Sequence, residues 1–191
     1  MIGGAASGRH GALAPSRWIL RHASLVPSGA RVLDLACGSG RHARLFAGRG
    51  CRVLAVDRDT EALAAMKGIA AIETREVDLE AGGWPLAGER FDAIVVANYL
   101  HRPLFPHLVA ALEDDGALLY ETFTRGNEAY GRPSNPDYLL ERGELLRLAG
   151  DWLTVVDFAQ GHVVTGERDA VVQRLAAVGL RRPWPPALAP D

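Results

Sequence analysis

The residues best suited to chemistry lie in one short segment, 31–43, which reads Arg-Val-Leu-Asp-Leu-Ala-Cys-Gly-Ser-Gly-Arg-His-Ala. Its first half predicts a buried strand, and Gly38 and Gly40 predict a turn that leads into a helix. Such a turn exposes backbone N–H groups and has no Cβ atoms to block a nucleotide-like ligand. Asp34 places a carboxylate in the apolar strand, where burying a charge is costly unless it meets a cation. The segment therefore predicts a site for a nucleotide-like molecule that carries a positive charge.

Two further acids follow at similar spacing. Asp57 comes 23 residues after Asp34, and Asp78 comes 21 residues after Asp57, each at the end of a predicted strand. Ligands of parallel sheets bind at the carboxyl ends of the strands, so the three acids should meet at one edge. A carboxylate offers two acceptor oxygens, which suits Asp57 for the two neighbouring hydroxyls of a ribose.

The glycines alone allow another interpretation. Residues 38–43 also fit the pattern G-x-G-x-x-G/A of dinucleotide-binding proteins, which is a weak signal by itself. A nicotinamide or flavin cofactor would place a phosphate at this turn, where Asp34 would repel it. A nicotinamide-dependent oxidoreductase therefore stays as the alternative function.

The elements that position these residues alternate between strand and helix. The pattern predicts strands at 31–37, 52–57, 72–78, 91–97 and 117–123, with helices at 41–48, 59–68 and 104–113. This order indicates an α/β fold with a doubly wound parallel sheet. A long polar loop, 124–142, breaks the rhythm and is predicted to be a lid. A helix at 144–149 and strands at 152–159 and 170–177 then form a hairpin-like ending.

The segment 31–43 resembles motif I of class I methyltransferases, which use S-adenosylmethionine. Roughly residues 16–148 are similar to small bacterial members of the tellurite-resistance-like group. The resemblance implies a Rossmann-like seven-stranded sheet with the last strand antiparallel, and S-adenosylmethionine as cofactor. It also implies the cofactor contacts: Asp34 near the cationic amino group, Asp57 on the ribose, and Asp78 with Leu79 at the adenine. The full predicted set of cofactor-binding residues is Asp34, Ala36, Gly38, Gly40, Asp57, Arg58, Asp78, Leu79 and Asn98. Ala36 stands where the family usually has glycine.

The acceptor side is predicted at the end of the fourth strand, in Asn98-Tyr-Leu-His-Arg-Pro103. His101 is the candidate general base, Tyr99 a wall or hydrogen-bond partner, and Arg102 a clamp for an anionic acceptor. Further acceptor contacts are expected from the lid, at Asn127, Glu128, Tyr130 and Arg132. No residue pattern indicates a metal site.

Length and composition favour one domain. The 191 residues are 48% hydrophobic and carry a net charge of −2, which gives no general attraction to nucleic acid or to an anionic membrane. We expect residues 1–30 to include a helix around Trp18 that covers the cofactor, 31–180 to form the methyltransferase domain, and 181–191 to be an extended tail. No signal peptide or membrane span is recognisable, and Cys37 and Cys51 are too far apart in the predicted sheet to bridge, which indicates a cytoplasmic protein.

The leading hypothesis is a methyltransferase acting on a small-molecule acceptor, as a monomer or homodimer. The chain shows no appended recognition domain, and residues 98–101 differ from the Asn-Pro-Pro-Tyr-type motif of the nucleic-acid amino-methylating enzymes. Besides the oxidoreductase, a non-catalytic S-adenosylmethionine-binding protein remains an alternative.

Overall fold

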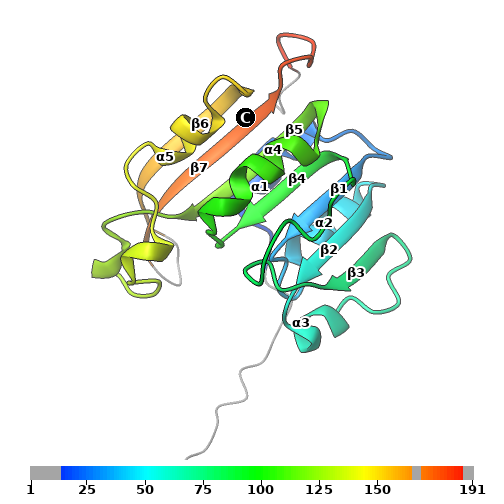
Figure 1. Cartoon of the computed structure of the whole chain (residues 1–191), viewed down its shortest axis with the longest axis horizontal. Helices are drawn as coiled ribbons and strands as arrows, with labels where there is room; N and C mark the ends of the chain where they lie inside the picture. The colour runs from blue at the N-terminus through cyan, green and yellow to red at the C-terminus, as the bar shows by residue number, and fades with distance from the viewer. Residues whose placement is uncertain (1–13, 165–168, 187–191) are drawn as a thin grey trace, which may run out of the picture.

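The fold is built on a seven-stranded sheet, seen in Figure 1 in a computed structural model that describes residues 14–164 and 169–186. The strands are β1 (Arg31–Leu35), β2 (Arg52–Asp57), β3 (Ile72–Glu76), β4 (Phe91–Ala97), β5 (Leu112–Phe123), β6 (Leu153–Val163) and β7 (Ala170–Gly179). Their spatial order is β3-β2-β1-β4-β5-β7-β6. The first five strands run parallel, and β7 is antiparallel to both β5 and β6. The expected doubly wound sheet with an antiparallel last strand is confirmed.

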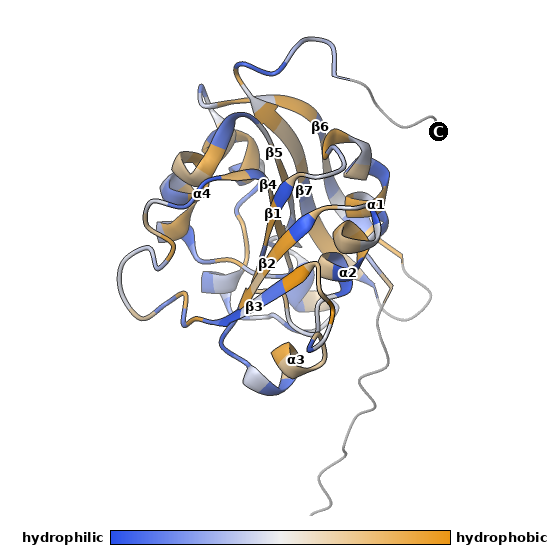
Figure 2. Ribbon diagram, turned by 90° about the vertical axis from the view of Figure 1, so that its right-hand side faces the viewer, coloured by the Kyte–Doolittle hydropathy of each residue, from blue (hydrophilic) through white to orange (hydrophobic). Residues whose placement is uncertain are grey.

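Helices cover both faces of the sheet. They are α1 (Arg17–His22), α2 (Arg41–Gly48), α3 (Thr60–Ala64), α4 (Phe105–Ala111) and α5 (Glu144–Ala149). Short 3₁₀ turns occupy Ala23–Leu25, Arg102–Leu104, Asn127–Ala129 and Pro136–Tyr138. In the side view, α4 lies on one face and α1 and α2 on the other (Figure 2). Two covered faces explain why the central strands are continuously apolar in sequence.

The two faces form two separate hydrophobic clusters. Along β1, Leu33 and Leu35 pack with residues of α4 and α5, whereas Val32 packs with residues of α1 and α2. This alternation follows from the period of two in a strand, which turns successive side chains to opposite faces.

Several elements differ in length from the prediction, and the largest differences are in α3 and β5. The helix α3 begins as expected, because the Asp59 side chain accepts a hydrogen bond from the Ala62 N–H at 3.0 Å, but it ends at Ala64. At that end the Ala65 N–H bonds back to Ala62 and Leu63 carbonyls, which tightens the last turn. Strand β5 starts earlier than expected, at Leu112. Leu112 pairs with Phe91 and Ala117 with Ala93, so residues 113–116 form a bulge in the pairing with β4. Gly116 in this bulge lies so close to the Asp92 carbonyl that a Cβ there would be 3.0 Å from its oxygen.

The helix α1 packs against the sheet instead of covering its carboxyl edge. Trp18 is 6% exposed within the second hydrophobic cluster, and α1 contacts β5. The His22 Nε2 and Asp157 Oδ2 atoms, 3.0 Å apart, also join α1 to β6. This helix therefore does not supply the cover that the sequence led us to expect; residues 1–13 of that segment lie outside the described range.

Three smaller expectations concern the thiols, the tail and the membrane. Cys37 and Cys51 are both buried free thiols, as predicted. The tail is described only as far as residue 186, where it has no regular structure. Among the helices of the described residues, none is long and apolar enough to cross a membrane.

Candidate functional site

A cleft of about 360 Å³ opens at the carboxyl ends of β1 to β4, and we call it the main cleft. It lies where the sheet order reverses between β1 and β4, the place where ligands bind in such sheets. Six of its lining residues were predicted to bind the cofactor: Ala36, Asp57, Arg58, Asp78, Leu79 and Asn98. The other four were not predicted for the cofactor: Val77, Glu80, Tyr99 and Tyr138.

Two residues of this lining hold a strained backbone. Ala36 has φ of 51° and Asn98 has φ of 59°, and within the described residues they are the non-glycine residues with positive φ. A left-handed conformation costs a non-glycine residue roughly 1–2 kcal/mol. Ala36 directly follows β1 and Asn98 directly follows β4, and these two strands are neighbours in the sheet. Both strands therefore turn sharply at the cleft, which explains why a glycine is usual at the position of Ala36.

The glycine turn after β1 is shaped by close packing. Gly38 and Gly40 have φ of 53° and 79°, and a Cβ on Gly40 would overlap the Met66 side chain. The Asp57 carboxylate fixes this turn from the neighbouring strand, because its two oxygens accept from the Gly38 N–H at 2.7 Å and the Asp59 N–H at 3.0 Å. A carboxylate has capacity for further hydrogen bonds, so Asp57 can also serve a ligand. Its contact with the ribose stays a prediction.

Asp34 has a different environment from the one predicted. It is 1% exposed, it is not part of the main cleft lining, and its Oδ2 accepts from the Ala43 N–H in α2 at 2.8 Å. Burial raises the pKa of this carboxyl to about 8, although the hydrogen bond from Ala43 opposes the shift. The structure thus gives Asp34 the task of joining β1 to the start of α2, and a direct contact with a cationic amino group stays a prediction.

The third acid lies on the exposed side of the cleft. Asp78 accepts a hydrogen bond from the Glu80 N–H at 2.9 Å, which holds the chain after β3 in a turn. Leu79, 6% exposed, and Val77 add apolar surface to the same wall. This combination suits the flat apolar face and the polar edge of an adenine, and the assignment of Asp78 to the adenine stays a prediction.

A second cavity of about 270 Å³ adjoins the main cleft, and we call it the side pocket. The two share one wall, made of Glu80, Asn98, Tyr99 and Tyr138. The side pocket also has its own lining: Leu100, Thr122, Phe123 and Pro133. Tyr99, predicted for the acceptor side, is thus placed between the two cavities.

His101 lines neither the main cleft nor the side pocket. It lines a small third cavity, which shares Tyr99 and Leu100 with the side pocket. The reason is local: His101 precedes the 3₁₀ turn Arg102–Leu104, which carries the chain back over the sheet toward α4. The predicted role of His101 as general base is therefore not supported by the geometry.

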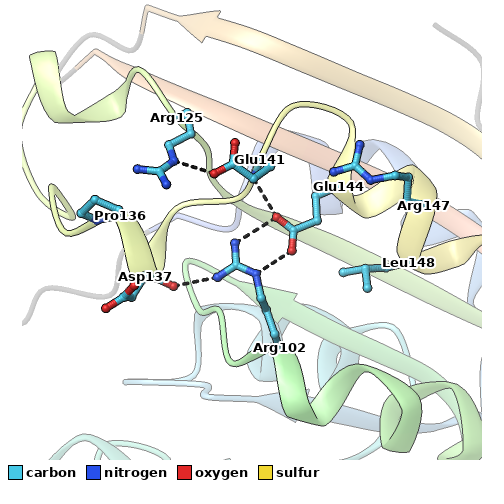
Figure 3. Close-up of a pocket in the computed structure, with 8 residues that line it drawn as sticks. All are labelled: Arg102, Arg125, Pro136, Asp137, Glu141, Glu144, Arg147 and Leu148. Atoms are coloured by element: carbon cyan, nitrogen blue, oxygen red, sulfur yellow. Dashed lines mark hydrogen bonds and ion pairs between the residues drawn. The ribbon is translucent and has the colours of Figure 1, made fainter.

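Arg102 is not free to clamp an anionic acceptor (Figure 3). Its Nε and Nη2 atoms donate to Glu144 at 2.6 and 2.9 Å, and its guanidinium also donates to the carbonyls of Asp137 and Leu139, both at 2.9 Å. A guanidinium has five N–H donors, and these contacts use most of them. We correct the predicted role: Arg102 ties the end of β4 to the lid and to α5.

The polar residues predicted as lid contacts have structural partners. Asn127, fully buried, donates to the Pro133 carbonyl at 3.0 Å and accepts from the Val171 N–H at 3.1 Å. Glu128 accepts from the Gly126 N–H at 2.8 Å, and Tyr130 stacks on His162 with ring centroids 4.5 Å apart. None of these residues, nor Arg132, lines the main cleft or the side pocket within the described parts of the chain.

The lid reaches the site through residues that the sequence analysis missed. Tyr138, at the end of the 3₁₀ turn Pro136–Tyr138, lines both cavities, and Pro133 lines the side pocket. Glu80 was missed as well, although it follows Asp78-Leu79 directly. An aromatic residue in Asn135-Pro-Asp-Tyr138 was the available signal for the lid contact.

The fold and part of the sequence are similar to those of known methyltransferases. Residues 32–116 match the family described as methyltransferase domain, and this segment contains the glycine turn and all three acids. The chain has the fold of the class I methyltransferases, and its segment 32–116 is similar to methyltransferase domains. No curated protein sequence matches it.

Solved structures share the fold at low sequence identity. The chain is 19% identical to TehB from Haemophilus influenzae, with a TM-score of 0.67, over 80% of this chain and 58% of that one. It therefore spans less than two thirds of the length of that protein. A TehB-like methyltransferase from Corynebacterium glutamicum is 21% identical, with a TM-score of 0.58, over 82% and 84% of the two chains. A coclaurine N-methyltransferase bound to N-methylheliamine and SAH is 14% identical, with a TM-score of 0.63, over 82% and 69%.

Proposed function

We propose that the protein transfers the methyl group of S-adenosylmethionine, held in the main cleft, to a small molecule held in the side pocket. The observation that carries this proposal is the shared wall of the two cavities, formed by Glu80, Asn98, Tyr99 and Tyr138. Because they share four lining residues, the two cavities adjoin, and fixing two reactants in contact where they meet would supply a large part of the rate enhancement.

The residues of the main cleft fit S-adenosylmethionine. Asp57 and Asp78 offer carboxylates, and Val77 and Leu79 offer apolar contacts for a base. When bound, the cofactor would supply a methyl group attached to a positively charged sulfur. Transfer of that methyl group leaves the rest of the cofactor as a neutral thioether. The chain's own residues then need to orient the acceptor, exclude water and hold a polar acceptor group in place.

The side pocket suits a small acceptor. Its volume of about 270 Å³ is near the lower end for ligand sites, and Phe123 and Pro133 enclose it on the side away from the main cleft. The net charge of −2 provides no general attraction to nucleic acid. We place the protein in the cytoplasm, because its two cysteines are free, buried thiols, as expected in a reducing compartment. The expected oligomeric state, a monomer or homodimer, stays a prediction.

Calorimetry with S-adenosylhomocysteine and with NADH tests the cofactor part of the proposal. We expect binding of S-adenosylhomocysteine only, because the Asp57 carboxylate accepts from the Gly38 N–H and so places a negative charge at the turn where a dinucleotide would need its pyrophosphate. Binding of NADH alone would favour the oxidoreductase alternative.

A screen for S-adenosylhomocysteine release over a panel of small molecules tests catalysis. For an acceptor found in this way, Phe123→Ala should raise KM, because Phe123 lines the side pocket only, while the affinity for S-adenosylhomocysteine stays within about twofold. A KM unchanged by Phe123→Ala would move the acceptor elsewhere, and tight cofactor binding without turnover on any acceptor would favour a non-catalytic binding protein.

A further inference from the structure

The walls of the side pocket carry one sign of charge. Three aromatic residues, Tyr99, Phe123 and Tyr138, surround it, and Glu80 is the charged residue of its lining. No Arg, Lys or His lines this pocket within the residues described. A carboxylate and the faces of aromatic rings both attract a cation, and the two together are a common way to recognise an ammonium group.

The hydroxyl of Tyr99 is a buried polar atom close to the Glu80 carboxylate. Among the residues that the structure describes, it makes no well-aligned hydrogen bond. Burial, and then the negative charges of Glu80 and Asp78, raise the pKa of this hydroxyl, so it stays a neutral phenol. A buried unpaired hydroxyl is costly, and a ligand N–H that donates to its oxygen would remove that cost.

The nearby cations do not face the side pocket. Arg58 lines the main cleft alone. Arg102 is engaged by Glu144, and Arg125 by Glu141 at 2.8 Å, around a separate cavity that Figure 3 shows. The charge of Arg58 reaches Tyr99, but an anionic acceptor in the side pocket would meet Glu80 without a cation in the lining that the structure describes.

We infer that the methyl acceptor is a small amine with an apolar body. Its nitrogen lies between the Glu80 carboxylate and the Tyr99 hydroxyl, and its apolar part packs against the rings of Phe123 and Tyr138. This inference rests on the proposed function, because it names the substrate class for the same two cavities.

The reaction balances without a further reactant. The amine enters as an ammonium ion and gives one proton to water, which frees the lone pair on nitrogen. The nitrogen then bonds to the methyl carbon while the carbon–sulfur bond breaks, and the sulfur keeps that electron pair. The positive charge passes from sulfur to nitrogen, and the methylated ammonium product remains a cation beside Glu80.

The test compares three probes with the same ring: benzylamine, benzyl alcohol and benzoate. Binding is measured by calorimetry to the full-length protein saturated with S-adenosylhomocysteine. We expect benzylamine to bind at least tenfold more tightly than the other two. Glu80→Gln should lower the affinity for benzylamine about tenfold and leave that for benzyl alcohol within about twofold. Glu76→Gln, which removes an exposed carboxylate outside both cavities, should change neither.

Because Glu80 also lines the main cleft, the affinity of Glu80→Gln for S-adenosylhomocysteine and its unfolding midpoint are measured alongside. The inference is overturned if benzylamine fails to bind, if benzoate or benzyl alcohol binds more tightly, or if Glu80→Gln keeps the preference for the amine. If S-adenosylhomocysteine itself does not bind, the proposed function fails. If it binds and the alcohol is methylated, the proposed function stands and the amine inference alone fails.

Discussion

Arg102 and Glu144 form a two-point ion pair between the end of β4 and the start of α5, with Nε–Oε1 and Nη2–Oε2 distances of 2.6 and 2.9 Å. The same guanidinium holds the carbonyls of Asp137 and Leu139, on both sides of Tyr138. Arg102 is therefore a positioning residue, because it fixes the lid segment that carries Tyr138 to both cavities.

Breaking this pair should loosen the lid. We expect Arg102→Ala to lower the free energy of unfolding by about 1–2 kcal/mol, since Glu144 is nearly buried whereas the Arg102 side chain is 38% exposed. Limited proteolysis should cut residues 124–142 faster in the variant. We also expect kcat to fall and KM to rise, because Tyr138 would no longer be held in position at the two cavities.

A double-mutant cycle separates this pair from an ordinary surface pair. The coupling energy of Arg102 with Glu144, from urea denaturation, should be about 1–2 kcal/mol. The matched control, Arg90 with Glu113, has side chains 43% and 41% exposed and should couple by no more than about 0.5 kcal/mol. Equal coupling in the two cycles would contradict the positioning role.

Asp57 should be the strongest single determinant of cofactor affinity. Asp57→Ala removes hydrogen bonds to a charged acceptor that are worth roughly 1.5–3 kcal/mol each, so affinity for S-adenosylhomocysteine should fall at least tenfold by calorimetry. Asp57→Asn keeps one acceptor oxygen for the Gly38 N–H and should be milder. Asp115→Ala, at the amino-terminal end of β5, is the control. An unchanged affinity in folded Asp57→Ala would remove the ribose assignment.

Ala36 should be a site where glycine is better for stability. Its φ of 51° is strained for alanine and free for glycine, so Ala36→Gly should raise the free energy of unfolding by about 0.5–1 kcal/mol. The same change at Ala47, inside α2, should lower it by a similar amount. Thermal or urea unfolding measures both variants. Destabilisation by Ala36→Gly would show that the turn does not strain the chain.

Asp34 should give stability a specific pH dependence. Its pKa is about 8 in the folded protein, against 3.8 for the ordinary carboxyl. Between these pH values the folded protein holds a proton that the unfolded chain has released. The contribution of Asp34 to the free energy of unfolding therefore falls as the pH rises from about 4 to 8, and it stays constant above about pH 8.

Urea denaturation of Asp34→Asn between pH 5 and 9 checks this dependence. The asparagine keeps an oxygen for the Ala43 N–H and does not titrate, so the variant should lose this contribution. The difference between wild type and variant should change steadily up to about pH 8 and then level off. A difference that stays constant with pH would show that Asp34 does not titrate in this range.

The sequence by itself determined the sheet and one rim of the site. The strand and helix periods, the glycine turn and the spacing of Asp34, Asp57 and Asp78 depend on residues that are neighbours in the chain, so they could be read without a structure. These features predicted the main cleft and the fold. They also predicted the start of α3, where the Asp59 side chain caps the helix.

The tertiary structure alone decided which polar residues face a ligand. His101 and Arg102 follow β4 directly, yet the turn after Asn98 sends one to a small buried cavity and the other to Glu144, 42 residues away in the chain. Tyr138 reaches the two cavities because contacts from Arg102 and the buried Asn127 fold the lid back over the sheet. Such long-range contacts compete for each polar group, and the hydrogen bonds that win depend on packing between distant segments, which local sequence patterns do not encode.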